Sequence, residues 1–170
     1  MMNEAMYQAV HDLRTLIQYL KVEGAPAVGV SGLSLGGYVS SAAASVDDGI
    51  AFCIPNASPV SVIDVAAGWW SAGGYIRTLL NREGLDLDFL RHAFAGHCAL
   101  TWPSRIGNSR HAIVAGAGDR FVPPQFPRLL SKHWGDAPIH WFPGNHLIHR
   151  GQSHYNRKIL EFMKTQCGIH

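Results

Sequence analysis

The chain is poor in cysteine and in charge, and both shortages exclude classes of protein. Its 170 residues include only three cysteines, Cys53, Cys98 and Cys167, an odd number without metal-type or redox-type spacing. We therefore expect reduced thiols rather than a disulfide framework. Charged residues make up 15% of the chain, the net charge is +2, and there is no basic block. Nucleic acid and anionic membranes are thus not indicated as partners.

Long apolar runs are also missing. No stretch approaches the roughly 20 apolar residues that a membrane-spanning helix needs. The first residues, MMNEAMYQAVHDLR, lack the basic segment followed by an apolar segment that marks a signal peptide. We expect no membrane span and a cytoplasmic location.

What the chain does contain is an alternation of strand-like and helix-like segments. At 47% hydrophobic residues it can bury the core of one domain, 1–170. The apolar pattern predicts helices at 4–22, 35–46, 124–133 and 148–164, and strands at 27–31, 50–54, 111–115 and 139–142. Pro55 is expected to end the second strand. The alternation predicts an α/β fold, with a mostly parallel sheet of about four strands and helices on both faces.

The stretch VGVSGLSLGGYVSSAAA, residues 28–44, places Gly-x-Ser-x-Gly at a strand-to-helix turn. A serine at the tip of such a turn is strained and exposes its hydroxyl, so Ser34 is a candidate nucleophile. Gly32 and Gly36 are expected to prevent collisions with the neighbouring strand and helix. The Leu35 N–H, at the positive end of the helix, is a candidate oxyanion donor. The alternative is a Gly-rich connection with a capping serine.

Two further residues follow the carboxyl ends of predicted strands. Asp119 lies in GAGDRFVP after the third strand, and His146 lies in FPGNH after the fourth. The carboxyl ends of parallel strands meet at one edge, so Ser34, Asp119 and His146 should gather there. Their chain order suits a nucleophile, acid and base at this type of turn. Asp119 as a simple turn residue and His149 as the base are the alternatives.

A metal site is the other interpretation of the histidines. His140, His146, His149 and His154 lie close together in the chain. Carboxylate or thiolate partners are not at useful spacing, so we predict no metal and no cofactor.

The segments GLSLGG, GAGDRFVPP and HWFPGNH together resemble the catalytic half of an α/β-hydrolase, over nearly the whole chain. Within that superfamily the chain looks most like bacterial hydrolases of the α/β-hydrolase-domain 18 type. The resemblance implies Ser34 as nucleophile, Asp119 as acid and His146 as base, acting on a small-molecule acyl substrate such as a carboxylic ester.

Residues 56–110 are too many for an ordinary connection. Their short helical patterns predict a helical cap insertion within the single domain. Trp69 and Trp70 are candidate substrate-binding residues there, and plain packing is the alternative for each.

The chain also departs from the α/β-hydrolase pattern. Only one helix precedes the strand that leads to Ser34, and no His-Gly-Gly-Gly-like stretch supplies a second oxyanion donor. We therefore expect a partial, truncated α/β-hydrolase with weak hydrolysis, unless residues 55–60 supply that donor. An exposed sheet edge should then favour a homodimer or a protein partner. The competing hypothesis is a non-catalytic module that binds such a partner.

Overall fold

The computed structural model of the chain describes residues 2–168. Its four strands form one parallel sheet in the spatial order β1-β2-β3-β4. They are β1 (Val30–Leu33), β2 (Cys53–Asn56), β3 (Ile113–Gly116) and β4 (Ile139–Phe142). The predicted α/β class and the four-stranded parallel sheet are confirmed.

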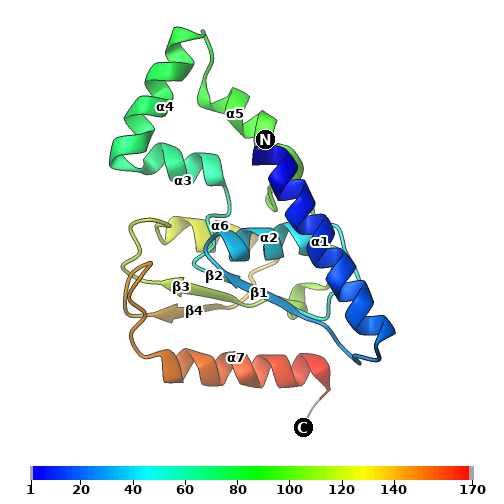
Figure 1. Cartoon of the computed structure of the whole chain (residues 1–170). Coiled ribbons are helices and arrows are strands. Elements are labelled where there is room, and N and C mark those ends of the chain that lie inside the picture. The colour runs from blue at the N-terminus through cyan, green and yellow to red at the C-terminus, as the bar shows by residue number, and fades with distance from the viewer. Residues whose placement is uncertain (1, 169–170) are drawn as a thin grey trace.

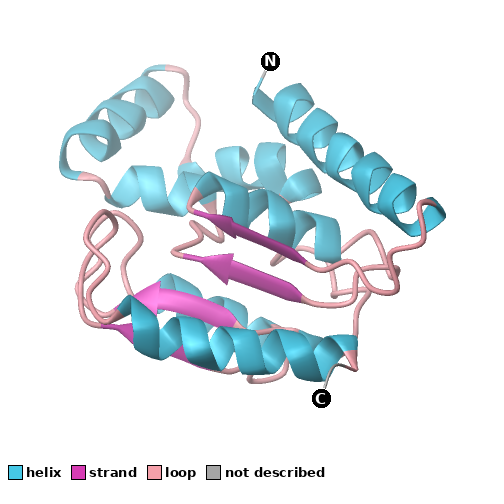
Figure 2. Ribbon diagram, turned by 60° about the horizontal axis from the view of Figure 1, so that its bottom comes forward, coloured by secondary structure: helices cyan, strands magenta, loops and turns pink. Residues whose placement is uncertain are grey.

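Helices cover both faces of this sheet, as expected. Figures 1 and 2 show α7 on one face, with α1, α2 and α6 on the other. The helices are α1 (Met2–Val22), α2 (Leu35–Ala44), α3 (Val62–Gly68), α4 (Trp70–Arg82), α5 (Leu87–Phe94), α6 (Gln125–His133) and α7 (Gln152–Cys167), with 3₁₀ turns at Ala95–His97 and Asn108–Arg110. Among residues 2–168, no helix has the length and apolar character needed to cross a bilayer.

The two faces have separate apolar cores, because successive side chains of a strand point to opposite faces. Val30, Cys53 and Ile113 contribute to the core beneath α1, α2 and α6. Ile54 and Val114, one residue further along their strands, contribute to the core against α7.

Several predicted boundaries are wrong. β1 begins at Val30 rather than at residue 27, and α7 begins at Gln152 rather than at 148, after Gly151 in a left-handed conformation. Pro55 does not end β2, which continues to Asn56. A proline has no N–H to donate to the ladder, and the pairing of β2 with β3 is correspondingly sparse.

The segment between β2 and β3, which we call the insertion (residues 57–112), is helical. Figure 1 shows α3, α4 and α5 beyond α2 and α6, on the side of the molecule away from α7. Ser61 caps α3 by accepting a hydrogen bond from the N–H of Asp64, and Arg91 of α5 forms an ion pair with Asp64. The Asn3 side chain of α1 donates to the carbonyl of Ala93 (2.8 Å). These polar contacts connect the insertion internally and to α1; its action as a substrate cap stays a prediction.

Candidate active site

The turn that carries Ser34 is strained and tightly packed. Ser34 has φ 53° and ψ −115°, between the end of β1 and the start of α2. Its N–H donates to the carbonyl of Asn56 at the end of β2 (2.8 Å), which fixes the turn to the neighbouring strand. A non-glycine residue at positive φ is uncommon and persists only where the surroundings enforce it.

Only one of the two glycines of the motif acts as the sequence pattern suggested. A Cβ on Gly32 would collide with the backbone of Gly36, so the first glycine of the motif is required. A Cβ on Gly36 would meet no atom within 4 Å beyond its own helix, so the expectation for the second glycine is wrong. The crowded position is Gly37, where a Cβ would lie 2.9 Å from the Gly32 carbonyl oxygen and 3.0 Å from Ser58 Cβ. Close approach of α2 to β1 therefore depends on Gly32 and Gly37.

Asp119 lies in the turn after β3, and its side chain is 1% exposed. Its Oδ1 accepts hydrogen bonds from the N–H groups of Phe121 (2.8 Å) and Val122 (2.9 Å). These bonds compensate the carboxylate for its lost hydration and orient Oδ2. Asp119 is thus a turn residue, as its alternative interpretation held, and at the same time the partner of a histidine.

His146 connects Asp119 to Ser34 through its two ring nitrogens. Nδ1 donates to Asp119 Oδ2 (2.8 Å), and Nε2 accepts from Ser34 Oγ (2.9 Å). This tautomer follows from the carboxylate, which can only accept. The structure therefore brings together the three residues that the sequence singled out, in the predicted arrangement.

A short hairpin after β4 holds the imidazole in place. Asn145 Oδ1 accepts from the N–H groups of Leu147 (3.0 Å) and Ile148 (2.8 Å). Gly144 has φ 156°, and a Cβ there would collide with the Ile148 carbonyl oxygen. The N–H of Gly118 donates to the Gly144 carbonyl (2.9 Å), which ties the hairpin to the Asp119 turn. The acid and the base are thus positioned by two loops that are bonded to each other.

His149, the rival base, has a different place. Its ring stacks on Phe142 with centroids 4.1 Å apart. Its Nδ1 is hydrogen bonded to the Tyr155 hydroxyl (3.2 Å), and Nε2 contacts the His146 carbonyl oxygen (3.4 Å). The structure places His146, not His149, between Ser34 and Asp119. It also places His149 in the hairpin rather than in the final helix.

The candidate oxyanion donors differ in availability. The Leu35 N–H belongs to the first turn of α2, where helix N–H groups have no acceptor within the helix. In the 55–60 loop, the N–H of Ala57 donates to the Val114 carbonyl (2.9 Å) and is therefore occupied. The oxyanion role of Leu35 stays a prediction.

The two tryptophans of the insertion lie in contrasting environments. The indole N–H of Trp69 donates to the Phe121 carbonyl (2.9 Å), and its ring meets the Phe121 ring at 82°. Trp70 is fully exposed, and its substrate role stays a prediction. Phe121 is a residue that sequence reasoning missed: its ring lies 5.5 Å from that of His146. Its place two residues after Asp119 was the available signal.

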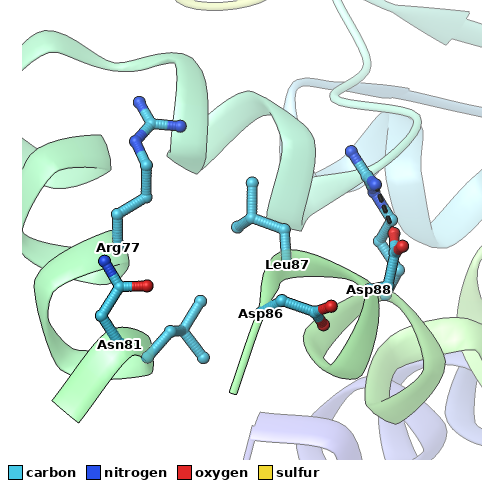
Figure 3. A pocket seen from close by; sticks show the side chains of 7 residues that line it. Arg77, Asn81, Asp86, Leu87 and Asp88 are labelled. Carbon is cyan, nitrogen blue, oxygen red and sulfur yellow. Dashed lines mark hydrogen bonds and ion pairs between the residues drawn. The ribbon is translucent and has the colours of Figure 1, made fainter. Parts of the chain in front are cut away.

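A pocket of about 320 Å³ lies between α4 and α5, apart from the Ser34 site (Figure 3). Its residues are Arg77, Leu80, Asn81, Asp86, Leu87, Asp88 and Arg91. Within it, Arg91 donates to Asp88 (2.6 Å), and it also pairs with Asp64. The ion pairs raise the pKa of the Arg91 guanidinium, which stays charged. Arg91 thus pairs with two carboxylates, and its pair with Asp64 links α5 to α3.

The histidines and cysteines are the remaining side chains that could bind a metal or act as nucleophiles. Across the described residues, no three His, Cys, Asp or Glu side chains lie in a metal-binding group; the side chain of His154 is outside the described part. Cys53, Cys98 and Cys167 are free. Burial raises the pKa of the Cys53 thiol, which disfavours the reactive thiolate.

The chain has the α/β-hydrolase fold, which is defined here by the parallel sheet, the strained serine turn and the loops at the strand ends. A puromycin-hydrolyzing peptidase of Mycobacterium tuberculosis superposes with a TM-score of 0.72 at 17% identity, over 95% of this chain and 26% of that one. A monoacylglycerol lipase of Paleococcus ferrophilus gives 0.66 at 18% identity, over 95% and 76%. An esterase of Pyrococcus furiosus gives 0.64 at 16% identity, over 93% and 62%.

Sequence relatives are also found. Two curated proteins of Mycobacterium tuberculosis, "Uncharacterized protein MT2702" (strain CDC 1551 / Oshkosh) and "Uncharacterized protein Rv2627c" (strain ATCC 25618 / H37Rv), are each 32% identical over 172 residues. The match covers 95% of this chain, and the chain spans 38% of the length of each relative. No model of a protein family matches the chain. Placement in the domain-18 type stays a prediction.

Proposed function

We propose that the chain carries the catalytic site of a serine hydrolase that cleaves carboxylic esters or related acyl compounds. The observation that carries the proposal is the pair of hydrogen bonds at His146, whose Nδ1 donates to Asp119 and whose Nε2 accepts from Ser34. The hydrolases among the structural neighbours, a peptidase, a lipase and an esterase, support hydrolysis in general.

The mechanism follows from these bonds. Ser34 Oγ attacks the acyl carbon while its proton moves to His146 Nε2, and Asp119 stabilises the resulting imidazolium. The Leu35 N–H donates to the oxyanion of the tetrahedral intermediate. When this intermediate collapses, His146 gives its proton to the leaving oxygen, and Ser34 stays acylated. Water then attacks the acyl-enzyme with His146 as base, which releases the acid and restores Ser34. None of these steps requires a metal or a cofactor.

Hydrolysis of p-nitrophenyl butyrate tests this proposal. The protein should release p-nitrophenol, and Ser34→Ala should lose nearly all of the activity because the covalent path is gone. Ser61→Ala is a matched control, since it removes a serine that caps α3 away from the site. Equal activity of Ser34→Ala and the unmodified chain would refute the proposal.

Within residues 2–168, no strand pairs with the outer edge of β1, and this favours a second candidate, a homodimer formed through β1. The even-numbered residues of β1 bond to β2, as Val30 N–H to the Phe52 carbonyl (2.9 Å) illustrates, so the N–H groups of Ser31 and Leu33 point away from the sheet. Beside that edge lies a mainly apolar groove of about 490 Å³ between α1, β1 and α2. Unpaired strand edges of this kind pair with other strands.

Light scattering tests the dimer, and Ser31→Pro is the variant that blocks its edge. The proline removes an outward N–H, and it also removes the hydrogen bond from Ser31 Oγ to the Ile54 carbonyl of β2 (2.7 Å), so Ser31→Ala, which loses only that bond, is the control. If β1 pairs with a second copy, the unmodified chain has the mass of a dimer and the variant that of a monomer. A monomeric unmodified chain would contradict this candidate while leaving the hydrolase proposal intact.

A further inference from the structure

Two aromatic rings form a corner beside the proposed base. Trp69 is 40% exposed and Phe121 is 50% exposed, and their planes meet at 82° with centroids 5.8 Å apart. The indole N–H of Trp69 is already bonded to the Phe121 carbonyl (2.9 Å). The corner therefore offers apolar ring surface rather than a free donor.

The corner is fixed to the catalytic loops on one side and to the insertion on the other. Phe121 follows Asp119, and its own N–H donates to Asp119 Oδ1 (2.8 Å). Trp69 lies between α3 and α4, where it ends one helix and precedes the next. The hydrogen bond from Trp69 to Phe121 thus joins the insertion to the loop that orients His146.

The location of the two rings indicates which part of the substrate they contact. The Phe121 ring lies 5.5 Å from the His146 ring, whose Nε2 faces Ser34. In the proposed mechanism, Nε2 delivers its proton to the leaving group, so that group must lie beside His146. The portion of the substrate next to Phe121 and Trp69 is therefore the alcohol or amine that departs.

We propose that Trp69 and Phe121 bind an aromatic ring in the leaving group of the substrate. This rests on the proposed serine hydrolase function and narrows it to aryl-bearing alcohols or amines. Aromatic rings interact favourably edge-to-face or offset-stacked, and two perpendicular rings offer both arrangements to a third. A saturated ring of similar size buries comparable area but lacks this interaction.

The test compares benzyl butyrate with cyclohexylmethyl butyrate, which share their acyl group and differ in the aromaticity of the leaving group. We expect kcat/KM to favour the benzyl ester by about threefold to tenfold. Trp69→Leu and Phe121→Leu should each reduce that preference, while Trp69→Phe, which keeps a ring, should retain most of it. Trp102→Leu is the matched control. Trp102 is 48% exposed and also donates to a backbone carbonyl, but its own carbonyl contacts His133 at the far end of α6.

A second measurement does not depend on turnover. In the Ser34→Ala protein, the indole N–H resonance of Trp69, identified by its loss in Trp69→Phe, should shift with benzyl butyrate and not with cyclohexylmethyl butyrate. Equal hydrolysis of the two esters, or a preference that survives both leucine variants, would overturn the aromatic corner and leave the hydrolase intact. If neither these esters nor p-nitrophenyl butyrate is hydrolysed, the proposed function fails. The Trp69 resonance then decides alone: a selective shift supports the corner, and no shift overturns it.

Discussion

Ser34, Asp119 and His146 act as one unit in the proposed mechanism, because His146 is hydrogen bonded to both of the other residues. A hydroxyl is a weak nucleophile until a base removes its proton, so loss of either member removes the same step. The free-energy costs of the two losses should therefore not add.

Mutation of both residues tests this dependence. Ser34→Ala and His146→Ala should each lower kcat for p-nitrophenyl butyrate by at least about 10³-fold, and the double variant should be little worse than either. Asp86→Asn is a suitable control, since Asp86 caps α5 within the insertion. Losses that multiply in the double variant would mean that the two residues act independently.

Among the elements, β4 was predicted at its observed bounds because its three apolar residues and His140 stand between turn signals. The start of α7 was not predictable in the same way. Residues 148–151 continue the helical pattern, but the hydrogen bonds of the His146 hairpin hold them out of the helix: the N–H of Ile148 donates to Asn145, and that of Arg150 to the Pro143 carbonyl. Contacts of this kind depend on side-chain geometry that a sequence pattern does not contain. The contact between Trp69 and Phe121, which are 52 residues apart in the chain, was not predicted for the same reason.

The junction of β1 and α2 offers a test at the scale of elements. Gly32→Ala should destabilise the chain by about 1–3 kcal/mol, because its Cβ collides with the Gly36 backbone. Gly36→Ala should be neutral or slightly stabilising, since its Cβ meets open space and alanine favours the helix. Urea unfolding of both variants makes the comparison. If Gly36→Ala costs as much as Gly32→Ala, the assigned packing of the turn is incorrect.

Over the whole molecule, a buried histidine far from the site should make stability depend on pH. His111 is fully buried, packs on Trp134 and is hydrogen bonded to Ser104 (2.9 Å). Burial lowers the pKa of His111 from 6.5 to about 4, so the folded chain keeps it neutral where the unfolded chain takes up a proton. The free energy of unfolding should therefore have its full value above pH 6.5 and should fall as the pH drops toward about 4.

Urea unfolding between pH 7 and pH 4 measures this effect. The contribution of His111 approaches about 1.4 kcal/mol per pH unit within that window. His111→Phe should have a shallower slope than the unmodified chain, although burial also lowers the pKa of His97 and leaves a residual slope. His11→Gln, which removes a histidine from the exposed surface of α1, is the control for the loss of a buried imidazole. An identical slope in His111→Phe would show that His111 takes up its proton in the folded state.

The most direct test of the central claim, that the folded chain activates Ser34 as a nucleophile, is covalent labelling with a fluorophosphonate. Mass spectrometry of the treated protein should show one adduct, located on Ser34 within residues 28–44. Ser34→Ala should take up no label, and His146→Ala should label far more slowly because its serine has lost the base. Ser61 serves as an internal control because its hydroxyl donates to Asp64 rather than to a histidine. An unlabelled protein, or an adduct that forms as fast in His146→Ala, would contradict the account.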